Sequence, residues 1–241
     1  MIQWSKVIIL RMKEPKNMPE RFSSREIFRI LEEEILTLKI PPGESLSENE
    51  LCERFGVSRS PIRSVLQELR LCDLVSITPY KRTQVTRMNF NIINQIIYMR
   101  IAVETFVLED FIRIPNMLEL ERLRHIHSSM VQLIQGESFT AREFYELDSK
   151  LHETWFNATR KEYLWDLIRN SNCHYTRFRM LDIVEIKNFS QIVDEHEALI
   201  AALENSDTDA IRPLMQKHLF GGISRLGKLL FSNLKDYFTE Q

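Results

Sequence analysis

The stretch from Ser47 to Val85 constrains the fold of this chain most, because it contains the starts of two short helices and the turn between them. Ser47 can cap the first helix while the side chain of Glu50 reaches back to the cap. Gly56 is the residue type that most easily takes the left-handed conformation at a helix end. Ser58, followed by a proline in the first turn, then begins the second helix. This pattern is typical of a helix-turn-helix.

The second of these helices has an apolar face and a polar face. Its apolar positions recur at helical spacing, and they are Ile62, Val65, Leu66 and Leu69. Arg59, Ser60 and Arg63 lie away from these positions, so their side chains project outward. The planar guanidinium of arginine can bond O6 and N7 of guanine, and serine hydroxyls can reach bases or phosphates. We therefore expect this helix to enter the major groove of DNA.

Two predicted strands, residues 74–78 and 83–86, follow the second helix and flank a turn that contains Lys81 and Arg82. This hairpin would form a basic wing beside the helix-turn-helix. The alternative is a small helical domain whose arginines are only solvated. That alternative requires the caps, the turn, the helix polarity and the wing to coincide by accident.

Residues 25–87 closely resemble, without a gap, the winged helix-turn-helix of GntR-family transcription regulators. The motifs that carry the resemblance are Pro41-Pro42-Gly43, Phe55-Gly56-Val57-Ser58-Arg59-Ser60-Pro61-Ile62-Arg63 and Leu74-Val75. By position, the resemblance implies DNA contacts from Asn49, Ser58, Arg59, Ser60 and Arg63. The predicted wing adds Lys81 and Arg82. Two positions depart from the family pattern: Asn49 stands where many relatives have arginine, and the wing lacks the usual glycine at its tip.

The charge of the chain is unevenly distributed. The whole chain of 241 residues has a formal net charge of −2. Residues 59–87 carry six basic and two acidic side chains, which gives +4, whereas residues 88–241 carry 17 basic and 22 acidic ones, which gives −5. Positive charge therefore lies where nucleic acid would bind, as steering and counterion release require.

Composition limits the class of protein further. With 44% hydrophobic and 27% charged residues, the chain can form two moderate domains. Its three cysteines are far apart and form no Cys-x-x-Cys pair, which argues against a disulfide framework or a zinc ribbon; they are Cys52, Cys72 and Cys173. No apolar run approaches the ~18 residues of a membrane span. We expect a cytoplasmic protein without a membrane partner.

We predict a mainly α fold with three segments. Residues 1–22 form an N-terminal extension, in which Met12 or Met18 could be the natural start, and residues 23–87 form the winged helix-turn-helix domain. Residues 88–241 show apolar periodicity near 3.6 and predict a helical bundle for effector binding and dimerisation. Its six helices, or seven if one breaks, are expected at residues 92–113, 116–135, 140–159, 161–182, 188–205 and 208–236.

Four polar residues of the bundle have the spacing of a metal site. Asp148 and His152 are four residues apart and project from one helix face. His196 and His218 lie at equal distances from the turn at Asp207, so an antiparallel pair of helices brings both to one level, about 15 Å from that turn. Such a set suits zinc first, or nickel or another divalent transition metal. A surface hydrogen bond within the Asp-x-x-x-His pair is the alternative.

Residues 92–225 also resemble a known domain, the FCD ligand-binding domain of the FadR-type branch of GntR regulators. The residues that carry the resemblance are Arg100, Glu104, Asp148, His152, Glu195, His196, Ala201, Asp207, His218 and Leu219. The resemblance implies a metal bound by Asp148, His152, His196 and His218. A polar core network that once held an ion is the alternative. Lys161 replaces an asparagine that is common in the family.

An ion with open coordination positions would attract a small carboxylate effector. The resemblance places effector contacts at Arg100, with Arg177 or Arg179 second, although these arginines could instead pair with helix carboxylates such as Glu104. The resulting hypothesis is a homodimeric repressor that binds a palindromic DNA operator and responds to an organic or sugar acid. The alternatives are a metal-dependent enzyme such as a hydrolase, and an architectural DNA-binding protein without an effector.

Overall fold

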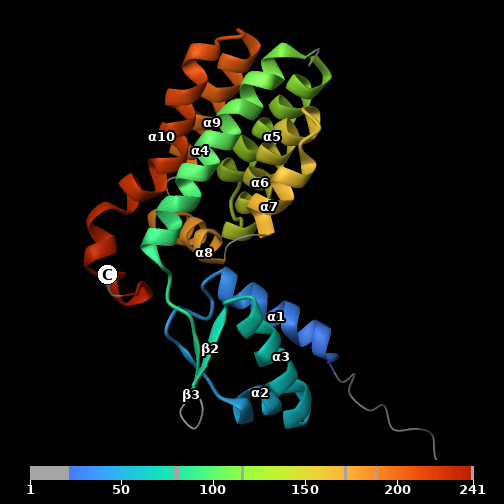
Figure 1. Cartoon of the computed structure of the whole chain (residues 1–241), viewed down its shortest axis with the longest axis vertical. Helices are drawn as coiled ribbons and strands as arrows, with labels where there is room; N and C mark the ends of the chain where they lie inside the picture. Colours follow the sequence, from blue (N-terminus) through green and yellow to red (C-terminus); the bar gives the residue numbers. More distant parts are fainter. Residues whose placement is uncertain (1–21, 79–81, 115–116, 171–172, 188, 240–241) are drawn as a thin grey trace, which may run out of the picture.

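The computed structural model describes residues 22–78, 82–114, 117–170, 173–187 and 189–239. Nearly all of the predicted N-terminal extension, and the wing turn with Lys81, lie outside these residues. Figure 1 shows two parts, a smaller N-terminal part with helices and a sheet and a longer bundle of helices above it. Within the described residues, no helix is both long and apolar enough to cross a membrane.

The N-terminal part contains three helices and a three-stranded antiparallel sheet with the strand order β1-β3-β2. The elements are α1 (Ser24–Leu36), β1 (Ser45–Leu46), α2 (Glu48–Phe55), α3 (Arg59–Leu71), β2 (Val75–Thr78) and β3 (Arg82–Val85). Strands β2 and β3 are the predicted hairpin. Strand β1, which pairs with β3, was missed, because two residues are too few to show an alternating pattern.

Local signals in the sequence explain these helices. Ser23 and Glu26 form a reciprocal capping box at the start of α1. The Ser47 side chain accepts from the backbone N–H of Glu50, and Gly56 ends α2 with φ of 64°. The apolar stripe of α3 is buried as predicted, at Ile62, Val65, Leu66 and Leu69.

The bundle begins after a short linker, residues 86–89. Its helices are α4 (Phe90–Arg113), α5 (Met117–Gln135), α6 (Ala141–Ala158), α7 (Glu162–Asn170), α8 (Cys173–Leu181), α9 (Phe189–Glu204) and α10 (Thr208–Leu226). A π-helical turn, η1 (Asp182–Ile186), follows α8, and two 3-10 turns, η2 (Gly227–Phe231) and η3 (Lys235–Tyr237), follow α10. The mainly α fold with a winged helix-turn-helix and a helical bundle is therefore confirmed.

The described residues of the bundle contain seven α-helices, the number expected if one of the six broke, and the bounds of two predicted helices need correction. The predicted helix 161–182 is divided into α7 and α8. The predicted helix 208–236 ends at Leu226, because Gly227 takes a positive φ of 45° and the chain continues in 3-10 turns. Both breaks bear on the site described below, since α8 and the segment after α10 contact the linker.

Each part has its own hydrophobic core. The core of the N-terminal part runs from Ile27 to Val85, and that of the bundle runs from Met88 to Leu234. In the bundle, α4 and α6 pack together, and α10 packs against both α4 and α9. These four helices surround a group of buried polar side chains.

Candidate metal centre and nucleic-acid interface

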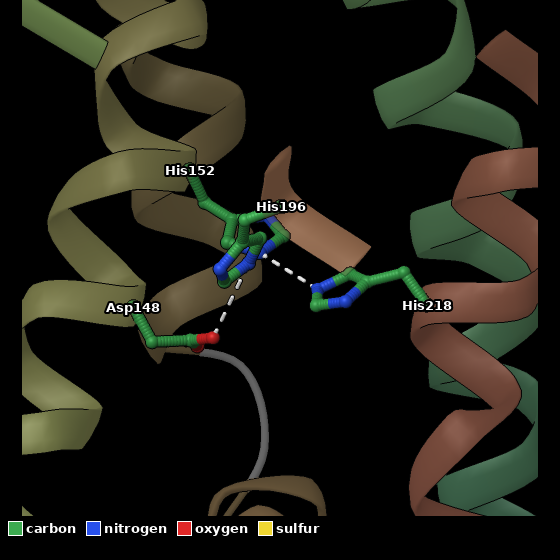
Figure 2. A group of neighbouring side chains, drawn as sticks. All are labelled: Asp148, His152, His196 and His218. Carbon is green, nitrogen blue, oxygen red and sulfur yellow. Dashed lines mark hydrogen bonds and ion pairs between the residues drawn. The ribbon is translucent and has the colours of Figure 1, made fainter. Parts of the chain in front are cut away.

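Asp148, His152, His196 and His218 meet inside the bundle, and we call these four residues the buried cluster. Figure 2 shows the four side chains pointing toward one another. Asp148 and His152 come from α6, one helical turn apart, whereas His196 comes from α9 and His218 from α10. One ligand atom from each residue lies within 4.8 Å of the others, and all four residues are buried. This set can hold one metal ion.

Two imidazoles of the cluster are oriented by carboxylates. The Nδ1 atom of His152 lies 2.6 Å from Glu104 Oε2, and the Nδ1 atom of His218 lies 3.1 Å from Glu195 Oε2. An ionised carboxylate only accepts hydrogen bonds, so each Nδ1 atom carries the proton. Arg100 Nη2 also lies 3.1 Å from Nδ1 of His152, but the shorter contact with Glu104 decides the tautomer. Metal-binding histidines commonly donate their second nitrogen to a carboxylate in this way.

The Nε2 atoms of these two imidazoles face each other. They are 3.2 Å apart, and with both protons on Nδ1 each presents a lone pair to the other. Burial lowers the pKa of His218 to about 4, despite its hydrogen bond with Glu195, so this imidazole is neutral at pH 7. Two opposed lone pairs repel unless a proton or a metal ion lies between them. The arrangement therefore fits a metal ion bound at both Nε2 atoms, in the place that a shared proton would otherwise take.

His196 gives a second indication of a missing partner. Neither of its ring nitrogens has a hydrogen-bond partner among the described residues, although the side chain is fully buried. Its Nε2 atom lies 3.5 Å from Asp148 Oδ1. A buried polar atom without a partner costs roughly 1–3 kcal/mol. Burial also holds the pKa of His196 well below its ordinary value, which leaves a neutral imidazole suited to metal binding.

Charged side chains surround the cluster in pairs. Arg100 Nε donates to Glu104 Oε1 at 2.6 Å, and Arg179 Nη2 donates to Asp148 Oδ1 at 2.9 Å. Burial opposes ionisation of Glu104, but the adjacent charge of Arg100 and the contact with His152 lower its pKa to about 2. Burial also opposes ionisation of Asp148, but Arg179 and the imidazoles hold its pKa well below the ordinary value. Both carboxylates are therefore ionised.

One further arginine completes this network. Arg225 Nη1 donates to Glu195 Oε1 at 3.1 Å, and Arg225 Nη2 donates to Asp182 Oδ2 at 2.8 Å. The network then holds three arginines and four carboxylates, namely Arg100, Arg179, Arg225, Glu104, Asp148, Asp182 and Glu195. With neutral imidazoles its net charge is −1. A divalent cation would change that charge to +1, which then favours an anionic ligand.

A small cavity opens beside the cluster. It has a volume of about 20 Å³ and is lined by side chains from α4, α6, α7 and α8, among them Arg100, Tyr145, Asp148, Trp165, Arg169 and Arg179. A space of this size holds about one water molecule. Its lining carries three guanidinium groups, so the chemistry of the wall suits an anion.

The predicted effector-binding arginines lie in different places. Arg100 lies beside the cluster, where its Nη1 atom donates to the Tyr175 hydroxyl at 2.6 Å. Arg177 lies at the junction of the two parts, and its Nη1 atom donates to the backbone oxygen of Thr86 at 2.6 Å. The neighbouring Arg179, named beside it in the sequence analysis, is the one that contacts the cluster. Side chains two residues apart on a helix face different directions, which explains the difference.

Sequence reasoning missed Arg225, Asp182 and Tyr175. Arg225 lies seven residues after His218 on α10, and Asp182 lies three residues after Arg179, so helical spacing places each on the face of a residue already noted. That spacing could have identified both. Tyr175 lies four residues before Arg179 on α8, so the same spacing places it on the face of Arg179, but the spacing does not show that it contacts Arg100, 75 positions away in the chain.

The remaining histidines differ from one another. His125 is exposed, but His127 is buried, with its Nε2 atom 3.0 Å from the backbone oxygen of Val193. His127 is covered because α9 packs against α5. His174 is also buried and lies at the junction of the two parts.

A second group of possible ligands, Asp73, Cys173 and His174, lies at this junction. The backbone N–H of Asn89 and the Nη2 atom of Arg177 both approach Nδ1 of His174, each at 3.3 Å. Two donors at Nδ1 place the imidazole proton on Nε2, which donates to Asp73 Oδ2 at 2.9 Å. Both nitrogens are thus engaged, and a guanidinium lies beside them. This group does not fit a cation.

The candidate DNA-binding side chains that the structure describes are exposed on the N-terminal part. Ser58, Arg59, Ser60 and Arg63 are exposed at the start of α3, and the Ser58 hydroxyl makes no capping hydrogen bond. Arg59 Nη2 donates to Asn49 Oδ1 at 2.9 Å, and Arg63 pairs with Glu48 at 3.0 Å. Arg82 is exposed on β3. These pairs are accessible to solvent, so DNA phosphates or bases can replace the partners.

Comparison with protein-family models gives two matches. Residues 23–85 match the model described as "Bacterial regulatory proteins, gntR family", and residues 95–221 match the model of the FCD domain. The FCD match alone covers more than half of the chain. Together the two matches cover the helix-turn-helix, the wing and all four residues of the buried cluster.

Curated proteins and solved structures show the same relationship. The chain is 26% identical over 224 residues to the HTH-type transcriptional repressor RspR of Escherichia coli K12, covering 92% of this chain and 96% of that protein. It is 30% identical over 211 residues to the gluconate operon transcriptional repressor of Bacillus licheniformis, covering 82% and 85%. The structure of E. coli McbR/YncC has a TM-score of 0.65 at 16% identity, covering 86% and 97%, which shows a shared fold.

Proposed function

Because this chain belongs to the gntR family of bacterial regulatory proteins and carries an FCD domain, it is a DNA-binding transcription regulator, and we propose that a metal-bound carboxylate controls its operator affinity. Relatives of the chain are repressors. Membership of this family also excludes the metal-dependent hydrolase considered above, since the chain is a regulator and not an enzyme.

The opposed Nε2 atoms of His152 and His218 carry the proposal of a metal. A divalent ion would receive Nε2 of both imidazoles, a nitrogen of His196 and an oxygen of Asp148. Three neutral nitrogens and one carboxylate oxygen suit zinc first, with nickel or another divalent transition metal as the next candidates. When bound, the ion would supply a Lewis-acidic position for an anionic oxygen.

A small carboxylate is the effector that this surrounding favours. Arg100 and Arg179 lie at the wall of the cavity, and the network would have a net charge of +1 with the ion bound. A guanidinium can bond the second oxygen of a carboxylate while the first oxygen approaches the ion. The relative named for the gluconate operon points to the sugar acids as a class to test first.

On the DNA side, we propose that α3 enters the major groove and β3 follows the backbone. The contacts would come from Asn49, Ser58, Arg59, Ser60, Arg63, Lys81 and Arg82. A single 13-residue recognition helix rarely supplies enough affinity, so a homodimer on a palindromic operator is expected. We expect the acid to release a repressor from its operator.

The exposed face of α4 is a candidate for the dimer contact. Tyr98 and Phe106 are 75% and 68% exposed, and Ala102 lies between them on the same face. Apolar side chains grouped on one helix face favour a partner surface. Phe106→Glu should therefore shift the protein toward the monomer in sedimentation velocity. Tyr163→Glu, which changes an equally exposed aromatic residue on α7, is the matched control and should leave the assembly unchanged.

The metal proposal is tested by elemental analysis of the purified protein. We expect one transition-metal ion per chain in the parent and in His125→Ala, which changes an exposed histidine, and a loss of most metal in His196→Ala. Organic and sugar acids are then screened for thermal stabilisation, and operator binding is measured with each acid that stabilises the protein. Equal metal content in His196→Ala and the parent would contradict the site. The absence of any stabilising acid would contradict the effector class.

A further inference from the structure

The C-terminal residues pair with the backbone of the linker. Met88 N donates to Tyr237 O at 2.8 Å, and Thr239 N donates to Met88 O at 2.9 Å, which makes a parallel bridge between Met88 and Phe238. The rings of Phe90 and Phe238 meet edge to face with centroids 6.0 Å apart. Figure 1 shows this last segment, drawn in red, beside the chain that joins the two parts.

The segment that makes this contact is residues 227–239, which we call the C-terminal strap. Gly227 turns the chain out of α10 with a positive φ, and Leu230 and Leu234 are buried in the bundle core. The strap is therefore anchored at two points before it reaches Met88. It lies beyond residue 221, where the FCD match ends, so the family model does not account for it.

Helix α8 holds the linker through other atoms. Arg177 Nη1 donates to the backbone oxygen of Thr86, and the backbone N–H of Asn89 donates to His174 Nδ1. His174 in turn donates to Asp73, in the turn after α3. Three of the four linker residues, Thr86, Met88 and Asn89, are thus bonded through their backbone to the bundle. A linker held at so many points cannot reorient without breaking hydrogen bonds.

Both holding elements also reach the buried cluster. Helix α8 carries Arg179, which donates to Asp148. Helix α10, which continues into the strap, carries His218 and Arg225, and both bond to Glu195. A shift of either helix at the cluster would therefore move a group that bonds the linker.

We propose that the C-terminal strap is a positioning element that fixes the linker, and through it the orientation of the N-terminal part on the bundle. Its link to sensing rests on the proposed metal-bound effector, but its action on the linker does not. If the strap only covered the bundle core, Leu230 and Leu234 would be sufficient, and the pairing of residues 237–239 with Met88 would have no effect on the linker.

Trypsin cleavage after Arg87 tests the strap directly. The Arg87 side chain is exposed, but Met88 is fully buried and both of its backbone polar groups are bonded, so cleavage requires local opening. Truncation after Leu234 removes both bonds to Met88 and keeps the two core leucines. Truncation after Thr239 removes only the last two residues and is the matched control. We expect cleavage about tenfold faster in the first variant and unchanged in the control.

A pair of substitutions tests the same contact without truncation. Thr239→Pro removes the N–H that bonds Met88 O, and Phe238 already has the extended conformation, φ −112° and ψ 153°, that a residue before proline requires. Thr239→Ala keeps the N–H. The loss of one hydrogen bond should accelerate cleavage about two- to tenfold in Thr239→Pro only. If the two truncated proteins are cleaved at equal rates, and Thr239→Pro and Thr239→Ala are as well, the proposal that the strap fixes the linker is wrong.

Zinc separates this inference from the proposed function. Zinc is added to the parent and to the variant truncated after Leu234, and its uptake is measured in the same samples. Slower cleavage of the parent after zinc uptake, without slowing in the truncated variant, supports transmission through the strap. Zinc uptake that leaves parental cleavage unchanged overturns transmission. Absence of uptake contradicts the metal site alone, because the comparison of variants without zinc still decides whether the strap holds the linker.

Discussion

The candidate DNA-binding side chains and those of the buried cluster are arranged in opposite ways. Arg59 and Arg63 each bond one partner, Asn49 and Glu48, in solvent, where an ion pair contributes little. Arg179 and its neighbours are buried and bonded to one another, where an unpaired charge is costly. The first arrangement leaves side chains free to exchange partners with DNA. The second arrangement holds the ligand atoms in place, and it brings two imidazole nitrogens together whose repulsion a cation would relieve.

Removal of one arginine from each region should give the largest difference in the free energy of unfolding between the two arrangements. Arg179→Ala leaves Asp148 buried without its ion pair, so we expect the free energy of unfolding to fall by about 3–5 kcal/mol. Arg63→Ala breaks an exposed pair and should cost only about 0–1 kcal/mol. Chemical denaturation of both variants measures the difference. Similar losses would show that burial does not distinguish the two regions.

A change of one methyl group can disturb the buried network without removing a charge. An added Cβ at Gly221 would lie 2.5 Å from Arg225 Nη1, so Gly221→Ala must displace a guanidinium that pairs with Asp182 and Glu195. We expect a loss of about 1–3 kcal/mol in stability, as for other overpacked sites. Ser224→Ala, at an exposed position of α10, is the control. A Gly221→Ala protein as stable as the parent would show that the network tolerates displacement of Arg225.

On the exposed side, Arg59→Ala should affect DNA binding and leave stability unchanged. The variant should lose roughly 1–3 kcal/mol of specific binding, because a guanidinium that reads bases would be absent. Fluorescence anisotropy with an operator selected by the parent protein measures this loss. Arg113→Ala, which removes an exposed arginine of the bundle, should bind as the parent does. Equal operator affinity of Arg59→Ala and the parent would remove Arg59 from the DNA interface.

The junction between the two regions should respond weakly to pH. Burial and the nearby Arg177 lower the pKa of His174 below its ordinary value, while Asp73 acts in the opposite direction and the partly buried Cys173 thiol lies beside it. Because the unfolded state then binds the proton more tightly, the stabilisation by His174 is present above pH ~6.5 and decreases below it. Protonation at Nδ1 would oppose the N–H donors of Asn89 and Arg177.

Hydrogen exchange at the Asn89 amide measures this response, after correction for the intrinsic rate at each pH. Protection in the parent should decrease between pH 7.5 and pH 5.5. His174→Gln keeps an acceptor and a donor but does not titrate, so its protection should not change. This is the smallest effect expected here. A parent that shows the same pH profile as His174→Gln would rule out a role for this imidazole.

Local signals explain why much of the N-terminal part could be predicted. The caps at Ser23 and Ser47 and the left-handed Gly56 act within a few residues, so the sequence alone identifies them. The four cluster residues could also be predicted, because two share a helix face and the other two lie at equal distances from one turn. Helical spacing places Arg225 and Tyr175 on the faces of His218 and Arg179, but it does not show which side chains they bond across the bundle.

The linker contacts were also missed, for a related reason. Arg177 or Arg179 was expected, after Arg100, to contact the effector, but the Arg177 side chain points toward Thr86. The strap follows a break at Gly227 that helical periodicity does not reveal. In both cases the contact joins two segments that are far apart in the chain. A periodic pattern within one segment does not reveal such a contact.

The cavity beside the cluster has consequences for the kinetics of recognition. A space of about 20 Å³ admits a water molecule but not an organic acid, so side chains that line it must move before such a ligand enters. Association would then be limited by this opening and not by diffusion. The observed rate of binding should reach a plateau as the acid concentration rises, and the height of that plateau reports the rate of the opening.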